Sequence, residues 1–205
     1  MSSFTNSCLG TAILSALLGL FVFAKDPKKP LNILWCLFCL SVGTWSTGLG
    51  MMVRSATMAE ALWWLKNVHY VGAIMIPIFF FHFVTLFFQL NARRTIILGY
   101  ALALIQQVLS LTGLLASVAP LPPFHFYTIP LPSYVLFVLY FFCYVAYSHW
   151  LLYKCHKTAS AQVRRQVKYI GIGTRSMAGC NALRIGSYAK AINKPMTTTD
   201  VTTAK

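Results

Sequence analysis

Five long apolar segments, separated by short polar connections, dominate the hydrophobic pattern of the chain. They cover residues 7–24, 31–53, 67–90, 95–118 and 134–153, and none of them contains Asp, Glu, Lys or Arg. A helix needs about 20 mostly apolar residues to cross a bilayer. The apolar positions run around each helix and do not form a single stripe, as expected when lipid covers most sides. The pattern therefore predicts an all-α fold, a polytopic membrane helix bundle with five clear spans.

The pattern weakens after residue 168. The uncharged stretch 169–174 begins like a sixth span, but closely spaced bases follow it, namely Arg175, Arg184, Lys190 and Lys194. Each of these would cost about 2.5–3.5 kcal/mol at the centre of a bilayer. We therefore expect a degenerate sixth span, a membrane-embedded domain over residues 1–174, and a basic, polar, disordered C-terminal tail over residues 175–205.

Charge is scarce and confined to the connections. Charged residues make up 10% of the chain, and the acids are only Asp26, Glu60 and Asp200. So few acids argue against paired-carboxylate catalysis, and no nucleophile–base arrangement stands out, so we expect no enzyme activity, cofactor or metal. The bases lie in short clusters between apolar blocks. Membrane topology accounts for that arrangement, whereas a nucleic-acid surface would spread them over a folded face.

The bases also divide unequally between alternate connections. One side has ten: Lys25, Lys28, Lys29, Arg93, Arg94, Lys154, Lys157, Arg164, Arg165 and Lys168. The other side has two, Arg54 and Lys66. Because basic connections stay in the cytoplasm, this predicts a multi-pass protein of the cell membrane with its N-terminus outside and its C-terminal tail cytoplasmic. The first segment lacks the basic start of a signal peptide, so we expect it to remain as a span.

Several landmark residues stand around the third span. The run LWWLKNVHYVG over 62–72 leads to Ile76-Pro77 and to FFFHF over 79–83. It is preceded by FVFAKDPKKPLN over 21–32 and LFCLSVGTWS over 37–46, and followed by QVRRQVKY over 162–169. This order resembles the seven-transmembrane N-terminal sensor region of bacterial and archaeal histidine kinases, over about residues 9–174.

The resemblance implies an integral membrane sensor-like module that detects a small-molecule or membrane signal. The family continues into a glycine-rich sixth helix, a seventh helix and a cytoplasmic transmitter, but only 31 residues run from Arg175 to Lys205 here. We therefore expect a chain that is truncated or divergent after about Thr174 and lacks its own kinase. Its partners would be the lipid bilayer and a separate histidine kinase, and a homodimer is compatible with this. The alternative is a small multi-pass membrane protein with a structural or transport role, although no internal repeat supports transport.

Aromatic and polar side chains in and beside the spans form the candidate ligand site. Rings with a few polar groups suit a small-ligand pocket, and ionisable groups inside a membrane are often functional. The predicted ligand-binding residues are Trp45, Trp64, His69, Tyr70, His82, Gln106, Phe124 and Tyr127. The same rings are typical of an interfacial aromatic belt, so the two interpretations stay open.

Two further features concern motion and closure. The uncharged connection 119–133, rich in proline and aromatic residues, is expected to lie on the outer membrane surface or cap the bundle, as a lid or as an anchor. Pro77 is expected to kink the third span, either as a hinge or as an ordinary bend. His69 and His82 are 13 positions apart and point to nearly opposite sides, so they cannot share a metal.

Overall fold

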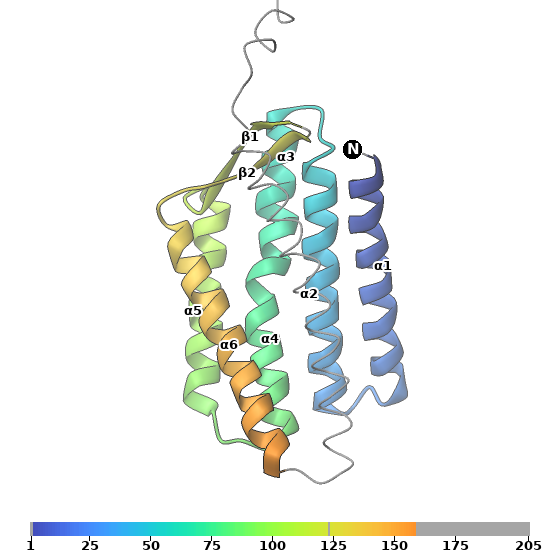
Figure 1. The fold of residues 1–205 in the computed structure, drawn as a ribbon, viewed down its shortest axis with the longest axis vertical. Coiled ribbons are helices and arrows are strands. Elements are labelled where there is room, and N and C mark those ends of the chain that lie inside the picture. The colour runs from blue at the N-terminus through green and yellow to red at the C-terminus, as the bar shows by residue number, and fades with distance from the viewer. Residues whose placement is uncertain (1, 123, 159–205) are drawn as a thin grey trace, which may run out of the picture. The chain divides into compact units, whose positions relative to one another are not determined.

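The computed structural model describes residues 2–122 and 124–158 (Figure 1). Within them, five helical stretches are long and apolar enough to cross a membrane. They are α1 (Ser2–Lys25), α2 (Pro30–Met52), a continuous stretch made of α3 (Met58–Trp64), η1 (Leu65–His69) and α4 (Tyr70–Phe87), then α5 (Arg93–Leu111) and α6 (Tyr134–Thr158). The predicted membrane helix bundle is confirmed. Residues through Leu151 form one compact unit, described below. The predicted degenerate sixth span and tail lie outside the described residues.

The third span begins at Met58, nine residues earlier than the apolar pattern predicted. The cause is a reciprocal cap at its start. The side chain of Thr57 accepts a hydrogen bond from the backbone N–H of Glu60 (3.2 Å), and the Glu60 carboxylate accepts one from the N–H of Ala56 (3.1 Å). Such a cap satisfies backbone donors that a helix start would otherwise leave unpaired. The polar residues before position 67 are therefore helical as well.

The fourth span ends at Leu111, before the predicted residue 118. Gly113 has φ +77°, the left-handed conformation that commonly stops a helix and that glycine adopts without strain. The chain then forms an antiparallel hairpin from β1 (Ala116–Leu121) and β2 (Phe124–Pro130), with Ala116 opposite Pro130. The uncharged connection thus has regular structure of its own.

The hairpin covers one end of the bundle (Figure 1), here called the hairpin end. The ring of Phe124 lies 4.9 Å from that of Phe4 at the start of α1. His125 Nδ1 is 3.3 Å from the carbonyl oxygen of Ser55, just after α2, and the Thr128 hydroxyl is 3.5 Å from the sulfur of Met52. These contacts hold the hairpin against the ends of α1 and α2.

Helices α2 and α4 touch through their backbones at two glycines. A Cβ placed on Gly48 would lie 2.6 Å from the Cα of His69, and one placed on Gly72 would lie 2.9 Å from the Cα of Trp45. Small residues permit such close approach between membrane helices. The backbones of α2 and of the η1–α4 stretch are therefore in direct contact at these two points.

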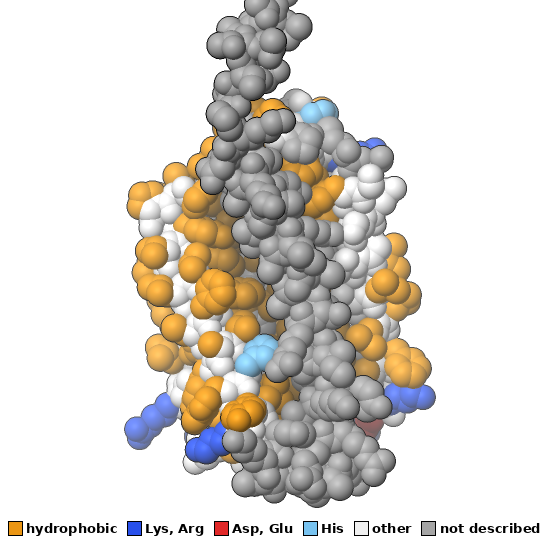
Figure 2. Space-filling view, in the orientation of Figure 1, with side chains coloured by type: hydrophobic (Ala, Val, Ile, Leu, Met, Phe, Trp, Pro, Cys, Tyr) orange, Lys and Arg blue, Asp and Glu red, His pale blue; other side chains and the backbone are white. Residues whose placement is uncertain are grey.

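The lipid-facing flanks are apolar, and the far end is basic. Figure 2 shows hydrophobic side chains over the sides of the bundle, with most of the visible Lys and Arg side chains at its lower edge. Exposed residues of α1 and α5 such as Leu14 and Leu104 belong to this flank. Lys25 and Arg93, at the turns opposite the hairpin, mark what we call the basic end. The helices thus lie as a bilayer would require, with charge only at their ends.

Candidate functional site

The start of α4 brings three of the predicted ligand-binding residues together. The imidazole of His69 lies 6.1 Å from the ring of Trp45 and 5.1 Å from that of Tyr70, between ring centroids. Tyr70 in turn meets Phe137 of α6 edge-on at 5.7 Å. An aromatic interior with scattered polar atoms therefore lies below the hairpin.

Several buried polar atoms in this half of the bundle have no hydrogen-bond partner among the described residues. They are Nδ1 of His69, Oε1 of Gln106, Nε2 of Gln107 and Oγ of Ser110. Gln106 is 3% exposed and Ser110 2% exposed. Because these two residues are one turn apart on α5, they lie on one face of that helix. Most buried polar groups in proteins are paired, so these atoms have unused hydrogen-bonding capacity.

The end of α5 lies beside η1. The ammonium of Lys66 is 2.6 Å from the position that a Cβ on Gly113 would take. Lys66 and His69 lie on one turn of η1, a π-helix, and single π-turns inside α-helices are frequent at functional sites. We use the name hairpin-end cluster for residues that share this end of the bundle: the ring group of Trp45, His69 and Tyr70, and the α5 residues Gln106 and Ser110.

By contrast, the polar groups described next, toward the basic end, have hydrogen-bond partners. His82 Nδ1 lies 3.0 Å from the hydroxyl of Tyr100 on α5. The hydroxyl of Tyr144 donates to the carbonyl of Thr95 (2.9 Å), and that of Ser148 donates to the carbonyl of Tyr144 (2.6 Å). His82 therefore lies apart from the hairpin-end cluster, facing another helix, in agreement with the predicted divergence of the two histidines.

The remaining predicted residues lie at the border of the cluster. Phe124 is buried and stacks on Tyr127 at 5.6 Å, so both belong to the docked hairpin. Trp64 is half-buried and meets Trp63 edge-on at 5.0 Å. The predicted hinge residue, Pro77, is buried inside α4. The structure thus divides the predicted set into a central group, a cap above it and the distant His82.

Sequence reasoning missed the residues of α6 that face this site. Tyr134 and Phe137 contact each other at 5.5 Å, and Tyr140 packs against Tyr144 one turn further on. Their spacing of three to four residues is that of one helix face and could have indicated a packed stripe. The uniformly apolar character of the span concealed it.

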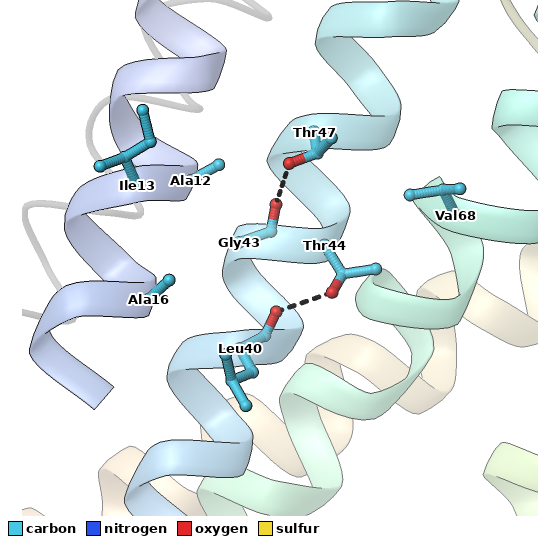
Figure 3. A pocket seen from close by; sticks show the side chains of 8 residues that line it. All are labelled: Ala12, Ile13, Ala16, Leu40, Gly43, Thr44, Thr47 and Val68. Atoms are coloured by element: carbon cyan, nitrogen blue, oxygen red, sulfur yellow. Dashed lines mark hydrogen bonds between the residues drawn. The ribbon is translucent and has the colours of Figure 1, made fainter. Parts of the chain in front are cut away.

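A groove on the lipid-facing flank is a separate feature (Figure 3). It measures about 380 Å³ and is lined by residues of α1, α2 and η1: Ala12, Ile13, Ala16, Leu40, Gly43, Thr44, Thr47 and Val68. The hydroxyls of Thr44 and Thr47 donate to the carbonyls of Leu40 and Gly43, both at 2.9 Å. The groove therefore offers hydrocarbon surface, and none of the predicted ligand-binding residues lines it. In the described part of the chain, no three His, Cys, Asp or Glu side chains are grouped to hold a metal.

These features define a multi-pass membrane helix bundle with an aromatic, partly polar interior at its hairpin end. A family model, the N-terminal 7TM region of histidine kinase, matches residues 7–203, so the chain belongs to that family. The match continues past Thr174, where the sequence resemblance was expected to fade. Neither a curated protein nor a solved structure matches the chain. The chain is therefore a membrane sensor-like input module, and such a region is not itself catalytic.

Proposed function

We propose that this input module binds a small neutral molecule in the interior of the hairpin end and reports it to a histidine kinase transmitter. The observation that carries the proposal is the unpaired state of Gln106 Oε1 and Ser110 Oγ, two buried atoms on one face of α5. A hydroxyl- or amide-bearing ligand would satisfy such atoms. The surrounding rings of Trp45 and Tyr70 would cover its apolar part.

The chemistry of the cluster favours a neutral ligand. None of its five residues is Asp, Glu, Lys or Arg, and a buried charge without a partner is strongly unfavourable. The nearby ammonium of Lys66 lies at the C-terminal end of α5, where the helix dipole already favours a cation. We therefore propose a ligand with at least one hydrogen-bond donor and one acceptor and no net charge.

The direction from which the ligand comes follows from the proposed topology. Basic connections at the end opposite the hairpin favour a cytoplasmic position for that end. The hairpin end then faces outward, and Phe124 and Tyr127 would close the site from outside. A signal from the outer leaflet or the external medium fits this arrangement.

The test uses the protein labelled with 5-fluorotryptophan in nanodiscs and observed by fluorine NMR. Benzyl alcohol is the neutral probe, and benzyltrimethylammonium is its charged counterpart. We expect benzyl alcohol to shift the Trp45 resonance saturably, and Gln106→Leu to weaken the apparent affinity by about tenfold, the equivalent of one lost hydrogen bond. Gln89→Leu, an exposed amide outside the site, is the matched control.

Two outcomes would contradict the proposed site. One is an equal response in wild type, Gln106→Leu and Gln89→Leu, and the other is a response to the charged probe alone. A second measurement needs no probe at all. Because Gln106 has an unpaired oxygen in the free protein, Gln106→Leu should increase the free energy of unfolding by about 1–3 kcal/mol.

A further inference from the structure

Helices α4 and α6 share a line of aromatic contacts that starts at the hairpin end and runs toward the basic end. It begins where Tyr70 meets Phe137 at 5.7 Å. Further along, Phe81 of α4 meets Tyr144 edge-on at 5.3 Å and stacks on Tyr147 at 5.5 Å. We call this line the α4–α6 seam. Since it begins at Tyr70, it starts within the hairpin-end cluster.

One hydrogen bond crosses the seam in its middle. The hydroxyl of Tyr140 donates to the backbone carbonyl of Ile74 at 3.0 Å, and both groups are buried. In the part of the chain that the structure describes, it is the hydrogen bond that joins α4 to α6. Ile74 lies one turn after Tyr70 and three residues before Pro77, so the bond connects α6 to the segment between the cluster and Pro77.

The position beside Pro77 gives this bond its mechanical importance. Proline has no N–H, so the carbonyl of Ala73 loses its intrahelical donor, and a helix bends more easily at such a turn. A membrane interior supplies no water to replace a broken hydrogen bond. Moving Ile74 away from α6 would leave the Tyr140 hydroxyl and its acceptor unsatisfied, so the two helices should move together at this point.

We infer that Tyr140 is a positioning residue that couples the part of α4 just before Pro77 to α6. A rearrangement at the hairpin-end cluster would bend α4 about Pro77 and carry α6 with it through the bond from Tyr140 to Ile74. The inference rests on the proposed function only for the origin of the rearrangement, because the coupling itself concerns two helices of the free protein.

The chain offers a matched control on the same helix. Tyr144 lies four residues after Tyr140 and also donates its hydroxyl to a backbone carbonyl, but that carbonyl belongs to Thr95 of α5 (2.9 Å). Tyr144→Phe and Tyr140→Phe remove the same chemical group and retain the ring. Only Tyr140→Phe breaks the bond to α4.

The reporter is Trp150 of α6. It stacks on Tyr147 at 5.6 Å and is therefore at the end of the seam toward the basic end. The experiment records its fluorine resonance in full-length, 5-fluorotryptophan-labelled protein in nanodiscs, without any ligand. Pro77→Ala, which restores the backbone donor at this turn of α4 and stiffens the helix, is the trigger. Tyr70→Leu, which removes the first ring contact of the seam, is a second trigger.

We expect Pro77→Ala to shift the Trp150 resonance when it is introduced into the wild-type protein and into Tyr144→Phe. In the Tyr140→Phe background, the same substitution should shift the resonance at least about threefold less. Comparing the single and double variants in this way is a double-mutant cycle. An equal shift in the Tyr140→Phe background would overturn the inference, as would no shift by either trigger in wild type. If Pro77→Ala does not fold, Tyr70→Leu decides by the same criteria. A merely structural Tyr140 would lower stability and leave these shifts unchanged. Because no probe is added, failure here is distinguishable from failure of the proposed ligand site.

Discussion

Replacing Gly48 by alanine should loosen the backbone contact between α2 and the start of α4. The new Cβ would lie 2.6 Å from the Cα of His69 and 2.8 Å from its Cβ, whereas ordinary contact begins at 3.4 Å. Since the nearest atoms are backbone or attached directly to it, no side-chain rotation relieves the clash. The two helices would have to separate by more than 0.8 Å, the difference between 2.6 and 3.4 Å, because the backbone nitrogen of His69 lies closer still.

The expected change in the free energy of unfolding is the balance of two opposing effects. Adding a methyl group to a close-packed interior costs about 1–3 kcal/mol. Alanine inside a helix is favoured over glycine by up to about 1 kcal/mol, which opposes that cost. Gly10→Ala in α1 measures the helix preference for alanine alone, because a Cβ there meets nothing within 4 Å. We therefore expect Gly48→Ala to be less stable than Gly10→Ala by about 1–3 kcal/mol.

The assay is equilibrium unfolding by SDS in mixed micelles, followed by circular dichroism, on wild type and both variants. In addition, the fluorine resonance of Trp45, which neighbours His69, should shift in Gly48→Ala and stay unchanged in Gly10→Ala. Equal stability of the two variants would show that the backbones of α2 and α4 are not in contact, and the reasoning on this pair would be refuted.

Three further expectations concern other parts of the chain. Reporter fusions at Ser2 and Asp26 should give an outside and a cytoplasmic signal respectively, and the reverse result would invert the proposed topology. Tyr100→Phe should lower the free energy of unfolding by about 1 kcal/mol, because it leaves half-buried His82 without its described partner, and an unchanged value in SDS titration would contradict that pairing. Phe124→Ala removes the ring contact with Phe4, so hydrogen exchange in the hairpin should accelerate while α5 stays protected, and unchanged exchange would show that the hairpin does not depend on that ring.

The five spans were predictable because hydropathy alone determines which segments can cross a membrane. Their ends depended on local polar chemistry that a hydropathy pattern does not weigh. The sequence Thr57-Met58-Ala59-Glu60 has the spacing of a capping box and could have indicated the early start of the third span. The hairpin was harder to predict from the sequence, because the pairing of Ala116 with Pro130 joins distant residues without a clear alternating pattern.

Part of the candidate site could also be predicted from the sequence. Trp45, His69 and Tyr70 lie at matching depths of two adjacent spans, and the structure brings them together. His82 could have been separated from them in advance, since 13 residues of helix extend about 20 Å. The bond from Tyr140 to the carbonyl of Ile74 was not predictable, because its acceptor is a backbone atom that every residue possesses.

The packing of α4 differs on the two sides of Pro77, and this difference determines where a bend can go. Before the proline, Gly72 holds α4 against the backbone of α2 at Ser41 and Trp45. After it, rings mediate the contact with α2: Phe80 lies 5.5 Å from Phe38, and Phe83 lies 5.0 Å from Trp35. Rings can slide where backbones in contact cannot, since interhelical side-chain packing allows small shear motions. A rearrangement at the hairpin end should therefore move the first half of α4 together with α2 and, through the bond from Tyr140 to Ile74, with α6, while the sliding rings after Pro77 accommodate the bend.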